Sequence, residues 1–293
     1  MDNILEVKNV TKEYKNFKID DLSFTLEKGY IMGFIGPNGA GKSTTIKLIM
    51  NLIQKNKGQI KIFGLDNIKN EKEIKQKIGF VYDESYFYGD LTLTKMKNII
   101  APFYNEWDNS AFNKYLNDFN LDPNKKISQL SKGMKMKYSL ALALCHNPEL
   151  IIMDEPTSGL DPVFRSEILD ILYNFIQNEN KSIFFSTHIT TDLEKIADYI
   201  TFINNGKIIF SKPKDYILEN YGIVKGKKAL LNQDTRNMFI GLRENPFGFE
   251  ALTSNVSTAR KAFRGDCIIE RASLDDIMVY TVKGDKDNDK FNY

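Results

Sequence analysis

The sequence predicts an α/β fold built around a parallel sheet and a phosphate-binding loop. A glycine-rich loop, "GPNGAGKST" at Gly36–Thr44, lies between a short apolar run and a helical pattern. Two further apolar runs, "ELIIMDEP" and "KSIFFSTH", have the length of strands and are separated by a helical stretch. Short apolar runs of this kind, alternating with helices, are typical of buried strands in a parallel sheet.

Length and composition are those of a folded chain. Its 293 residues can hold one large domain or one domain plus a smaller one, and 42% hydrophobic residues are enough for a core. The 40 basic and 38 acidic residues leave a net charge of +2, so we expect no nucleic acid partner. The chain has no apolar run long enough to span a bilayer, and "MDNILEVKNV" lacks the profile of a signal peptide. We therefore expect a cytoplasmic protein, and the two cysteines predict neither a disulfide framework nor a zinc site.

The first part of the chain is predicted to be rich in strands. From Ile4 to Phe34, alternating segments such as "ILEVKNV" and "DLSFTL" are interrupted by polar and glycine positions. "IMGFIG" predicts a buried strand that enters the glycine-rich turn, "KSTTIKLIMNLI" predicts a helix, and "GQIKIFG" predicts another strand.

The pattern becomes helical between Leu93 and Asn147, where Pro148 ends the last helix, and this predicts a helical subdomain at about 93–147. The apolar runs that follow flank a predicted helix at about 164–176. "YITFINNGKIIF" then predicts a hairpin whose turn is Asn205-Gly206. Together these elements predict a first domain of residues 1–213.

A smaller α+β domain is predicted at 214–282. "VKGKKALL", "MFIGL" and "CIIE" are candidate strands of a small sheet, and "SLDDIMVYTV" predicts a helix that starts with a capping box, Ser273 to Asp276. The charged end, "KGDKDNDKFNY" at 283–293, is predicted to be a disordered tail.

The glycine-rich loop fits the pattern GxxxxGK(S/T), with a strand before it and a helix after it. Backbone N–H groups of such a loop surround the β-phosphate of a nucleoside triphosphate, Lys42 reaches the β and γ oxygens, and Ser43 offers a hydroxyl to Mg²⁺. The residues expected to bind the nucleotide here are Gly36, Pro37, Asn38, Gly39, Ala40, Gly41, Lys42, Ser43 and Thr44.

Three residues are candidates for the chemistry. Asp154 ends a predicted buried strand and can hold Mg²⁺, while Glu155 can orient or deprotonate an attacking water. His188 follows "IFFST" and is a candidate sensor of the γ-phosphate, although a single histidine at a strand end is more often structural.

A second candidate anion site lies in "QLSKGMKMKYSLALALC". Ser131 is a good N-cap for this helix, and Gly133 allows a ligand close to the backbone. Lysines near the positive end of the helix dipole favour a negative ligand, and they are Lys132, Lys135 and Lys137.

The order P-loop, "LSKGM", "IIMDEPTSGLDP" and "STH" resembles the ATP-binding subunit of an ABC transporter, over about Leu5 to Lys212. GTPases and small-molecule kinases share the P-loop but not the other three motifs. The resemblance implies a P-loop NTPase domain, with a RecA-like core and with antiparallel β and helical subdomains. It also implies ATP hydrolysis coupled to transport, with ATP and Mg²⁺ as cofactors.

The resemblance implies further site residues. "SKGM" matches the family signature, usually LSGGQ, so Ser131 and Gly133 would bind the γ-phosphate of ATP held by a second subunit. Asp161 lies in the "SGLD" loop that crosses the dimer interface, and His188 is the switch histidine. Tyr14 stands where the family stacks an aromatic ring on adenine, although an exposed strand tyrosine remains the alternative. One chain cannot complete a site, so the resemblance implies a homodimer or a pair with a close paralogue.

The sequence departs from the family pattern at two places. The signature has Lys132 in place of glycine and Met134 in place of glutamine. In "IGFVYDES", Asp83, or Glu84 by a shift of one residue, stands where the family has a glutamine close to Mg²⁺. Asp83 could coordinate Mg²⁺ tightly or act through water.

Acidic residues at that position resemble a bacterial subgroup of ABC-2-type exporters, which handle antibiotics, peptides and sodium. The resemblance implies separate integral-membrane permease subunits and a location at the cytoplasmic face of the cell membrane. The aromatic run "YFYGDL" falls where such a permease docks, although subdomain packing explains it equally well. For residues 214–282 we expect an accessory domain that steadies the dimer, with a ligand-binding regulatory domain as the alternative.

The alternative function is a soluble ABC ATPase acting on the ribosome or on DNA. The repair type needs a long coiled-coil insertion and the ribosomal type carries tandem ATPase domains, and this sequence has neither. A catalytically inactive regulatory module is disfavoured because Lys42, Asp154, Glu155 and His188 are all present.

Overall fold

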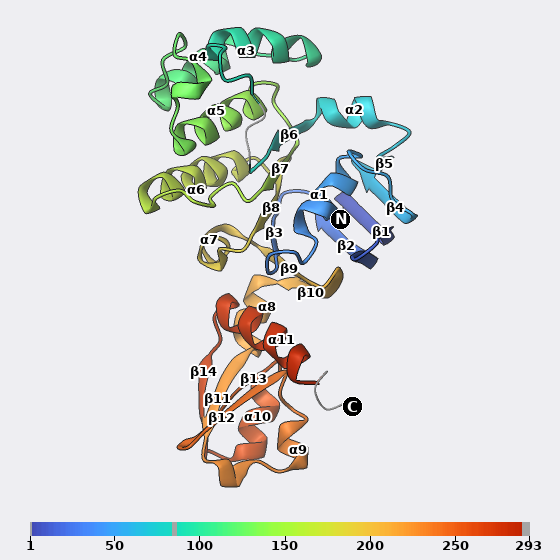
Figure 1. Ribbon diagram of the computed structural model, residues 1–293, viewed down its shortest axis with the longest axis vertical. Helices are drawn as coiled ribbons and strands as arrows, with labels where there is room; N and C mark the ends of the chain where they lie inside the picture. Colours follow the sequence, from blue (N-terminus) through green and yellow to red (C-terminus); the bar gives the residue numbers. More distant parts are fainter. Residues whose placement is uncertain (1, 84–86, 289–293) are drawn as a thin grey trace. The chain divides into compact units, whose positions relative to one another are not determined.

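The computed structural model describes residues 2–83 and 87–288, which form two compact units (Figure 1). Unit 1 is Met1–Asp192 with Tyr199–Ser211, and unit 2 is Leu193–Asp198 with Lys212–Tyr293. The predicted fold class is confirmed, since unit 1 contains a mainly parallel sheet, an antiparallel sheet and a helical cluster, and unit 2 is α+β.

The central sheet of unit 1 has six strands in the order β10-β9-β3-β8-β7-β6. Its inner strands are parallel, with β3 between β8 and β9 and with β7 between β6 and β8. All residues of β3, β7 and β8 are buried, which explains why apolar residues dominate these strands. The strands are β3 (Ile31–Ile35), β6 (Ile78–Val81), β7 (Leu150–Asp154), β8 (Ser182–Thr187), β9 (Tyr199–Asn204) and β10 (Lys207–Pro213).

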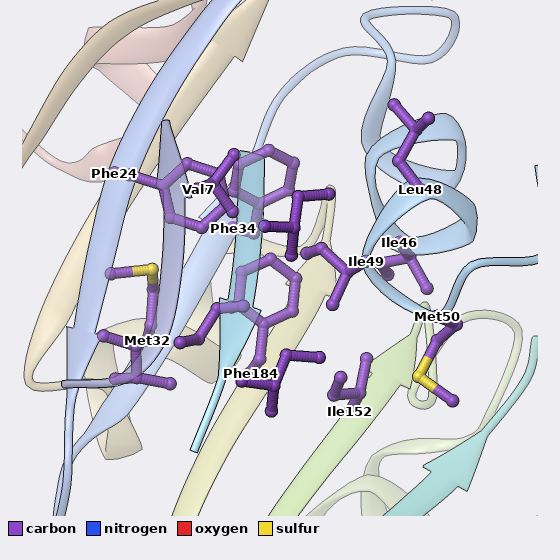
Figure 2. Packing of buried hydrophobic residues seen from close by; sticks show 14 of the residues in the cluster. Val7, Phe24, Met32, Phe34, Ile46, Leu48, Ile49, Met50, Ile152 and Phe184 are labelled. Atoms are coloured by element: carbon purple, nitrogen blue, oxygen red, sulfur yellow. The ribbon is translucent and has the colours of Figure 1, made fainter. Parts of the chain in front are cut away.

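The antiparallel sheet of unit 1 has the order β2-β1-β4-β5. Its strands are β1 (Asn3–Glu13), β2 (Lys18–Glu27), β4 (Lys57–Ile62) and β5 (Leu65–Asp66). The first helix, α1 (Lys42–Ile49), shares one hydrophobic core with both sheets. In Figure 2 the rings of Phe34 and Phe184 lie close together in this core, with centroids 5.2 Å apart.

The helical cluster of unit 1 has its own core. Tyr138 is fully buried in that core, and its hydroxyl donates to the carbonyl of Leu93 at 2.8 Å. These helices are drawn in green and blue-green in Figure 1. They are α3 (Leu93–Ile100), η1 (Ala101–Phe103), α4 (Asn109–Asp118), η2 (Ile127–Gln129) and α5 (Lys132–Leu144).

Three more helices belong to the first 198 residues: α2 (Glu71–Gln76), α6 (Pro162–Ile176) and α7 (Thr190–Ile196). The predicted turn between β9 and β10 forms at Asn205 and Gly206, with φ values of 46° and 73°. Gly206 is required there because a Cβ atom would lie 1.8 Å from the carbonyl oxygen of Lys18. Its N–H donates to the carbonyl of Ala40 at 2.9 Å, so this hairpin supports the glycine-rich loop.

Unit 2 contains a four-stranded antiparallel sheet in the order β12-β13-β11-β14. Its last helix, α11 (Leu274–Asn288), packs on β12 and β13, and the predicted capping box forms between Ser273 and Asp276. The other elements are α8 (Lys214–Asn220), β11 (Gly222–Gly226), η3 (Lys228–Leu230), α9 (Gln233–Arg236), β12 (Gly241–Asn245), β13 (Gly248–Thr253), α10 (Val256–Phe263) and β14 (Ile268–Arg271).

Two features of the described residues bear on the predicted domain bounds. The sequence predicts a disordered tail at 283–293, and the last helix, α11, extends to Asn288, while residues 289–293 lie outside the described part of the chain. Residues 193–198 group with unit 2, and within that unit the Glu194 side chain accepts from the backbone N–H of Leu274 at 3.0 Å. No helix among the described residues is long and apolar enough to cross a membrane.

Candidate nucleotide-binding site

The glycine-rich loop joins β3 to α1 and borders a cleft of about 650 Å³. Two of its glycines are needed for the backbone path. A Cβ atom on Gly36 would lie 2.3 Å from the carbonyl oxygen of Ile203, and Gly41 has φ +113° as the N-cap of α1. A Cβ atom on Gly39 would meet nothing within 4 Å, so the loop is open on that side. The cleft is lined by Phe17, Asn38, Gly39, Gly41, Lys42, Ser43, Thr44, Asp83, Glu155, Ser158 and His188.

Lys42 is buried at the base of this cleft. Its ammonium group donates to the carbonyls of Gly36 and Pro37 at 2.8 and 3.4 Å, and lies 3.1 Å from Glu155 Oε1. Only 6% of the Lys42 side chain and 12% of the Glu155 side chain are exposed, so each charge depends on the other for compensation. A triphosphate that enters the cleft would therefore compete with Glu155 for the same cation.

Glu155 also contacts His188. Its Oε2 atom lies 2.7 Å from His188 Nδ1 and accepts from the His188 backbone N–H at 3.2 Å. Glu155 has φ 50°, an unusual conformation for a non-glycine residue, and its own N–H donates to the Ser186 carbonyl. The strained backbone places the carboxylate between Lys42 and His188, as a functional site often does.

The residues present fit a magnesium ion bound with phosphate. Asp154 is 3% exposed, and one carboxylate oxygen accepts from the Ser186 hydroxyl at 2.6 Å, which fixes the side chain. Ser43 and Asp83 both line the cleft. Mg²⁺ prefers oxygen ligands and is commonly held by one or two carboxylates together with substrate phosphates. The oxygen atoms of these residues are of the chemical kind that suits Mg²⁺, although Asp154 itself is not among the residues that line the cleft.

Ser131, Gly133 and Asp161 are not among the residues that line this cleft. Ser131 caps α5 and accepts from the Met134 N–H at 3.2 Å, as predicted. Asp161 caps α6, accepting from the N–H groups of residues 163 and 164. The starts of two helices thus carry the signature and "SGLD" residues outside the cleft that holds Lys42.

The lysines near the start of α5 are not equivalent. Lys137 lies 2.6 Å from Glu167 on α6, so it is engaged between the two helices. Lys132 lies 3.7 Å from Asp83, the residue predicted to stand in the place of the family's glutamine. Glu84, the alternative at that place, lies outside the described residues.

The aromatic residues singled out in the sequence, Tyr14 and the run "YFYGDL", have different surroundings. Tyr14 is 46% exposed and lies beside Phe17, with ring centroids 6.4 Å apart, but it is Phe17 that lines the cleft. In "YFYGDL", residue 86 lies outside the described residues, Phe87 packs on Tyr138 in the helical core, and Tyr88 is 67% exposed.

Three residues of the site were not identified from the sequence, and they are Phe17, Ser158 and Ser186. Phe17 is three positions after Tyr14, and an aromatic residue so close to the first was a usable signal. Ser186 belongs to β8 and reaches Asp154 only because β7 and β8 are neighbouring parallel strands, paired at these two positions. A pattern within a short segment does not show which strands pair in the sheet.

Comparison with known proteins agrees with this geometry. A sequence profile of the ABC transporter family matches residues 19–158. The chain is 36% identical over 220 residues to the bacitracin transport ATP-binding protein BcrA of Bacillus licheniformis, covering 74% of this chain and 72% of that protein. It is 33% identical over 215 residues to the lantibiotic transport ATP-binding protein SrtF of Streptococcus pyogenes, covering 72% and 92%.

A solved structure of the ATP binding subunit of an ABC transporter has the same fold. Its TM-score is 0.66 at 28% identity, and the match covers 74% of this chain and 92% of that chain. Extensive likeness to ATP-binding proteins of transporters, in sequence and in fold, means that this chain belongs to the ABC transporter family.

Proposed function

We propose that this chain is the ATP-hydrolysing subunit of an exporter and works in a pair that encloses two ATP molecules. The observation that supports this proposal is that the cleft residues and the signature residues of one chain lie in different places. Lys42, Glu155 and His188 meet in one cleft, whereas the start of the signature helix α5 lies outside its lining. Each chain then supplies one P-loop and one signature, so a second copy or a close paralogue is needed to complete each site.

Within one chain, the loop residues 36–44 hold the phosphates of ATP, and Lys42 moves from Glu155 to the β and γ oxygens. Glu155, relieved of that cation, takes a proton from the attacking water, and His188 remains within hydrogen-bond reach of Glu155. Ser43, Asp154 and Asp83 would hold Mg²⁺, which would supply positive charge beside the phosphates. The neighbouring residues Tyr14 and Phe17 offer aromatic rings to the adenine.

Across the pair, Ser131 and Gly133 bind the γ-phosphate of ATP held by the partner, since they stand at the positive end of α5. Asp161 fixes the loop that meets the partner. Residues 1–213 act as the ATPase domain in this proposal, and residues 214–282 act as an accessory domain that steadies the pair.

The transport step requires separate integral-membrane subunits, with this chain at the cytoplasmic face of the membrane. Relatives named for transport of bacitracin and of a lantibiotic support export of a peptide or an antibiotic. Purification of the chain from its own cells with membranes solubilised is expected to bring permease subunits with it. Recovery of ribosomes or DNA alone would favour the soluble alternative.

The two-subunit site is tested with Ser131→Arg. The bulky cation would block the signature helix from the partner's phosphate, while the chain's own cleft stays intact. We expect ATP binding by the monomer to persist, and ATP-driven dimerisation and hydrolysis to be lost. Ser110→Arg is the matched control, because it makes the same change at an exposed position of α4. Dimerisation and hydrolysis that survive in the Ser131 variant would contradict the shared site.

A further inference from the structure

One side chain of the signature helix touches two loops that the mechanism uses. Lys132 is the first residue of α5, and its ammonium group lies 3.7 Å from Asp83 Oδ1. A Cβ atom on Gly159 would lie 3.1 Å from Lys132 Nζ and 3.8 Å from its Cδ and Cε atoms, so the lysine passes over the "SGLD" loop. Lys132 therefore links the start of α5, the loop before Asp161 and the loop of Asp83.

The two residues of this contact have opposite charges. An ammonium group and a carboxylate face each other, on residues that are far apart in the sequence.

We propose that Lys132 binds the γ-phosphate of ATP in the partner subunit, and that Asp83 holds Lys132 back until Mg²⁺ and ATP enter the chain's own cleft. The inference rests on the proposed two-subunit site and adds a residue and a control step to it.

The position of Lys132 suits both roles. It follows Ser131 directly and precedes Gly133, so it shares the positive end of α5 that faces the partner's phosphate. Its long flexible stem ends in a compact charge that can turn from one anion to another. The Lys132 and Asp83 side chains are 50% and 41% exposed, so their contact is weak enough to exchange.

The position of Asp83 explains how Lys132 is released when ATP binds. Asp83 lines the same cleft as Ser43 and Glu155, where the phosphates and Mg²⁺ are expected. A bound divalent cation is commonly the largest local charge in such a site and attracts a carboxylate more strongly than one ammonium does. Asp83 drawn toward that cation loses its hold on Lys132, which becomes available to the partner. Filling of one cleft thereby prepares the signature helix for the other, which is a coupling between the two ATP sites.

The test uses mixed dimers made from two differently tagged full-length chains. The first chain carries Glu155→Gln and holds labelled ATP in its own cleft without hydrolysing it. The second chain carries Lys42→Ala, so its own cleft stays empty and Asp83 keeps Lys132. Retention of the labelled ATP after a chase with unlabelled ATP is the readout, and it does not depend on hydrolysis.

Adding Asp83→Gln to the second chain should free Lys132. Retention of the labelled ATP should then lengthen about three- to fivefold, the change in affinity that one half-exposed ion pair typically makes. The matched control adds Lys132→Gly as well, and the effect of Asp83→Gln should then disappear. Asp83 cannot act here through its own Mg²⁺, because that cleft binds no ATP.

Unchanged retention on adding Asp83→Gln would overturn the proposal, and so would an equal gain in the chain that lacks Lys132. The two-subunit site is checked separately with dimers of the Glu155→Gln chain alone. If those dimers trap no ATP, the proposed function fails, whereas trapping there combined with no Asp83 effect removes only the role of Lys132.

Discussion

At the scale of single residues, the cleft is organised around Glu155. Its two carboxylate oxygens contact different groups, Lys42 on one side and His188 on the other. Its backbone has φ 50° and is held by the strand that carries Ser186. A general base must reach the attacking water with its carboxylate free to accept a proton. The base role that we propose for Glu155 therefore requires Lys42 to turn from Glu155 to the phosphate.

Glu155→Gln separates ATP binding from hydrolysis. Glutamine keeps the size and one oxygen of the side chain but cannot accept the proton, so hydrolysis should fall by about 10²–10⁴-fold. ATP that is not hydrolysed should accumulate the paired form, because it binds that form better than separate subunits. Size exclusion with ATP checks the pair, and phosphate release checks the rate. Wild-type hydrolysis in this variant would remove Glu155 from the base role.

At the scale of elements, the packing of α5 on α6 gives Gly133 a second reason to be glycine. A Cβ atom at this position would lie 2.9 Å from the ring of Phe164. Lys137 adds to the same contact, with its ammonium 4.8 Å from the Phe164 ring centroid and 2.6 Å from Glu167. The glycine that suits a phosphate therefore also suits close packing of two helices.

Gly133→Ala tests this packing. Alanine favours a helix over glycine by up to about 1 kcal/mol, and less in the first turn, whereas overpacking typically costs about 1–3 kcal/mol. The clash should win, and the variant should unfold at lower urea concentration. Phe164→Leu in the same chain should restore part of the loss. Equal stability of Gly133→Ala and wild type would mean that the ring moves aside freely.

The junction of α5 with β6 contains a buried histidine. His146 stacks on Tyr104 with ring centroids 3.8 Å apart, and its Nε2 lies 3.0 Å from the Ile78 carbonyl oxygen. Within the described part of the chain, its Nδ1 has no hydrogen-bond partner. Burial lowers the pKa of His146 below its ordinary value of 6.5.

This lowered pKa predicts acid sensitivity. The unfolded chain protonates His146 near pH 6.5, while the folded chain resists until a lower pH, so stability should decrease as pH falls below about 6.5. Urea unfolding at several pH values between about 7 and about 5 measures the slope. His146→Phe keeps a ring against Tyr104 and should flatten that slope, whereas an unchanged slope would assign it to other groups.

At the scale of the whole molecule, the chain contains two compact units with separate cores. Unit 2 has its own cluster of buried residues around Phe249 and Phe263, and its own sheet closed by α11. Lys214 and Leu274 of this unit both contact Glu194, a residue of α7. The two units are therefore not separated at a single position of the chain, because residues 193–198 group with unit 2 and residues 199–211 with unit 1.

Removal of the chain from Lys214 onward tests the accessory role. We expect self-association to weaken by about tenfold or more, with nucleotide affinity changing less, because the cleft is lined by residues of unit 1 alone. Sedimentation measures the association and nucleotide titration measures the affinity. Since this truncation removes the Leu274 N–H that donates to the Glu194 side chain, Glu194→Ala in the full chain is the control for the loss of that contact. Unchanged association would favour a regulatory role for unit 2.

The sequence by itself determined the features that depend on local spacing. The P-loop, the strand that leads into Asp154 and Glu155, and the capped helix from Ser131 each lie within about 20 consecutive residues, where backbone periodicity and glycine requirements are visible. The hairpin turn at Asn205-Gly206 was visible for the same reason.

Only the tertiary structure decided which distant residues meet. Ser186 reaches Asp154 through the pairing of β7 with β8, and Phe17 rather than Tyr14 lines the cleft. Asp83 and Lys132 are 49 positions apart in the numbering and come together across two loops. The physical reason is that such contacts depend on strand order and helix packing, which the whole core fixes and no short segment contains.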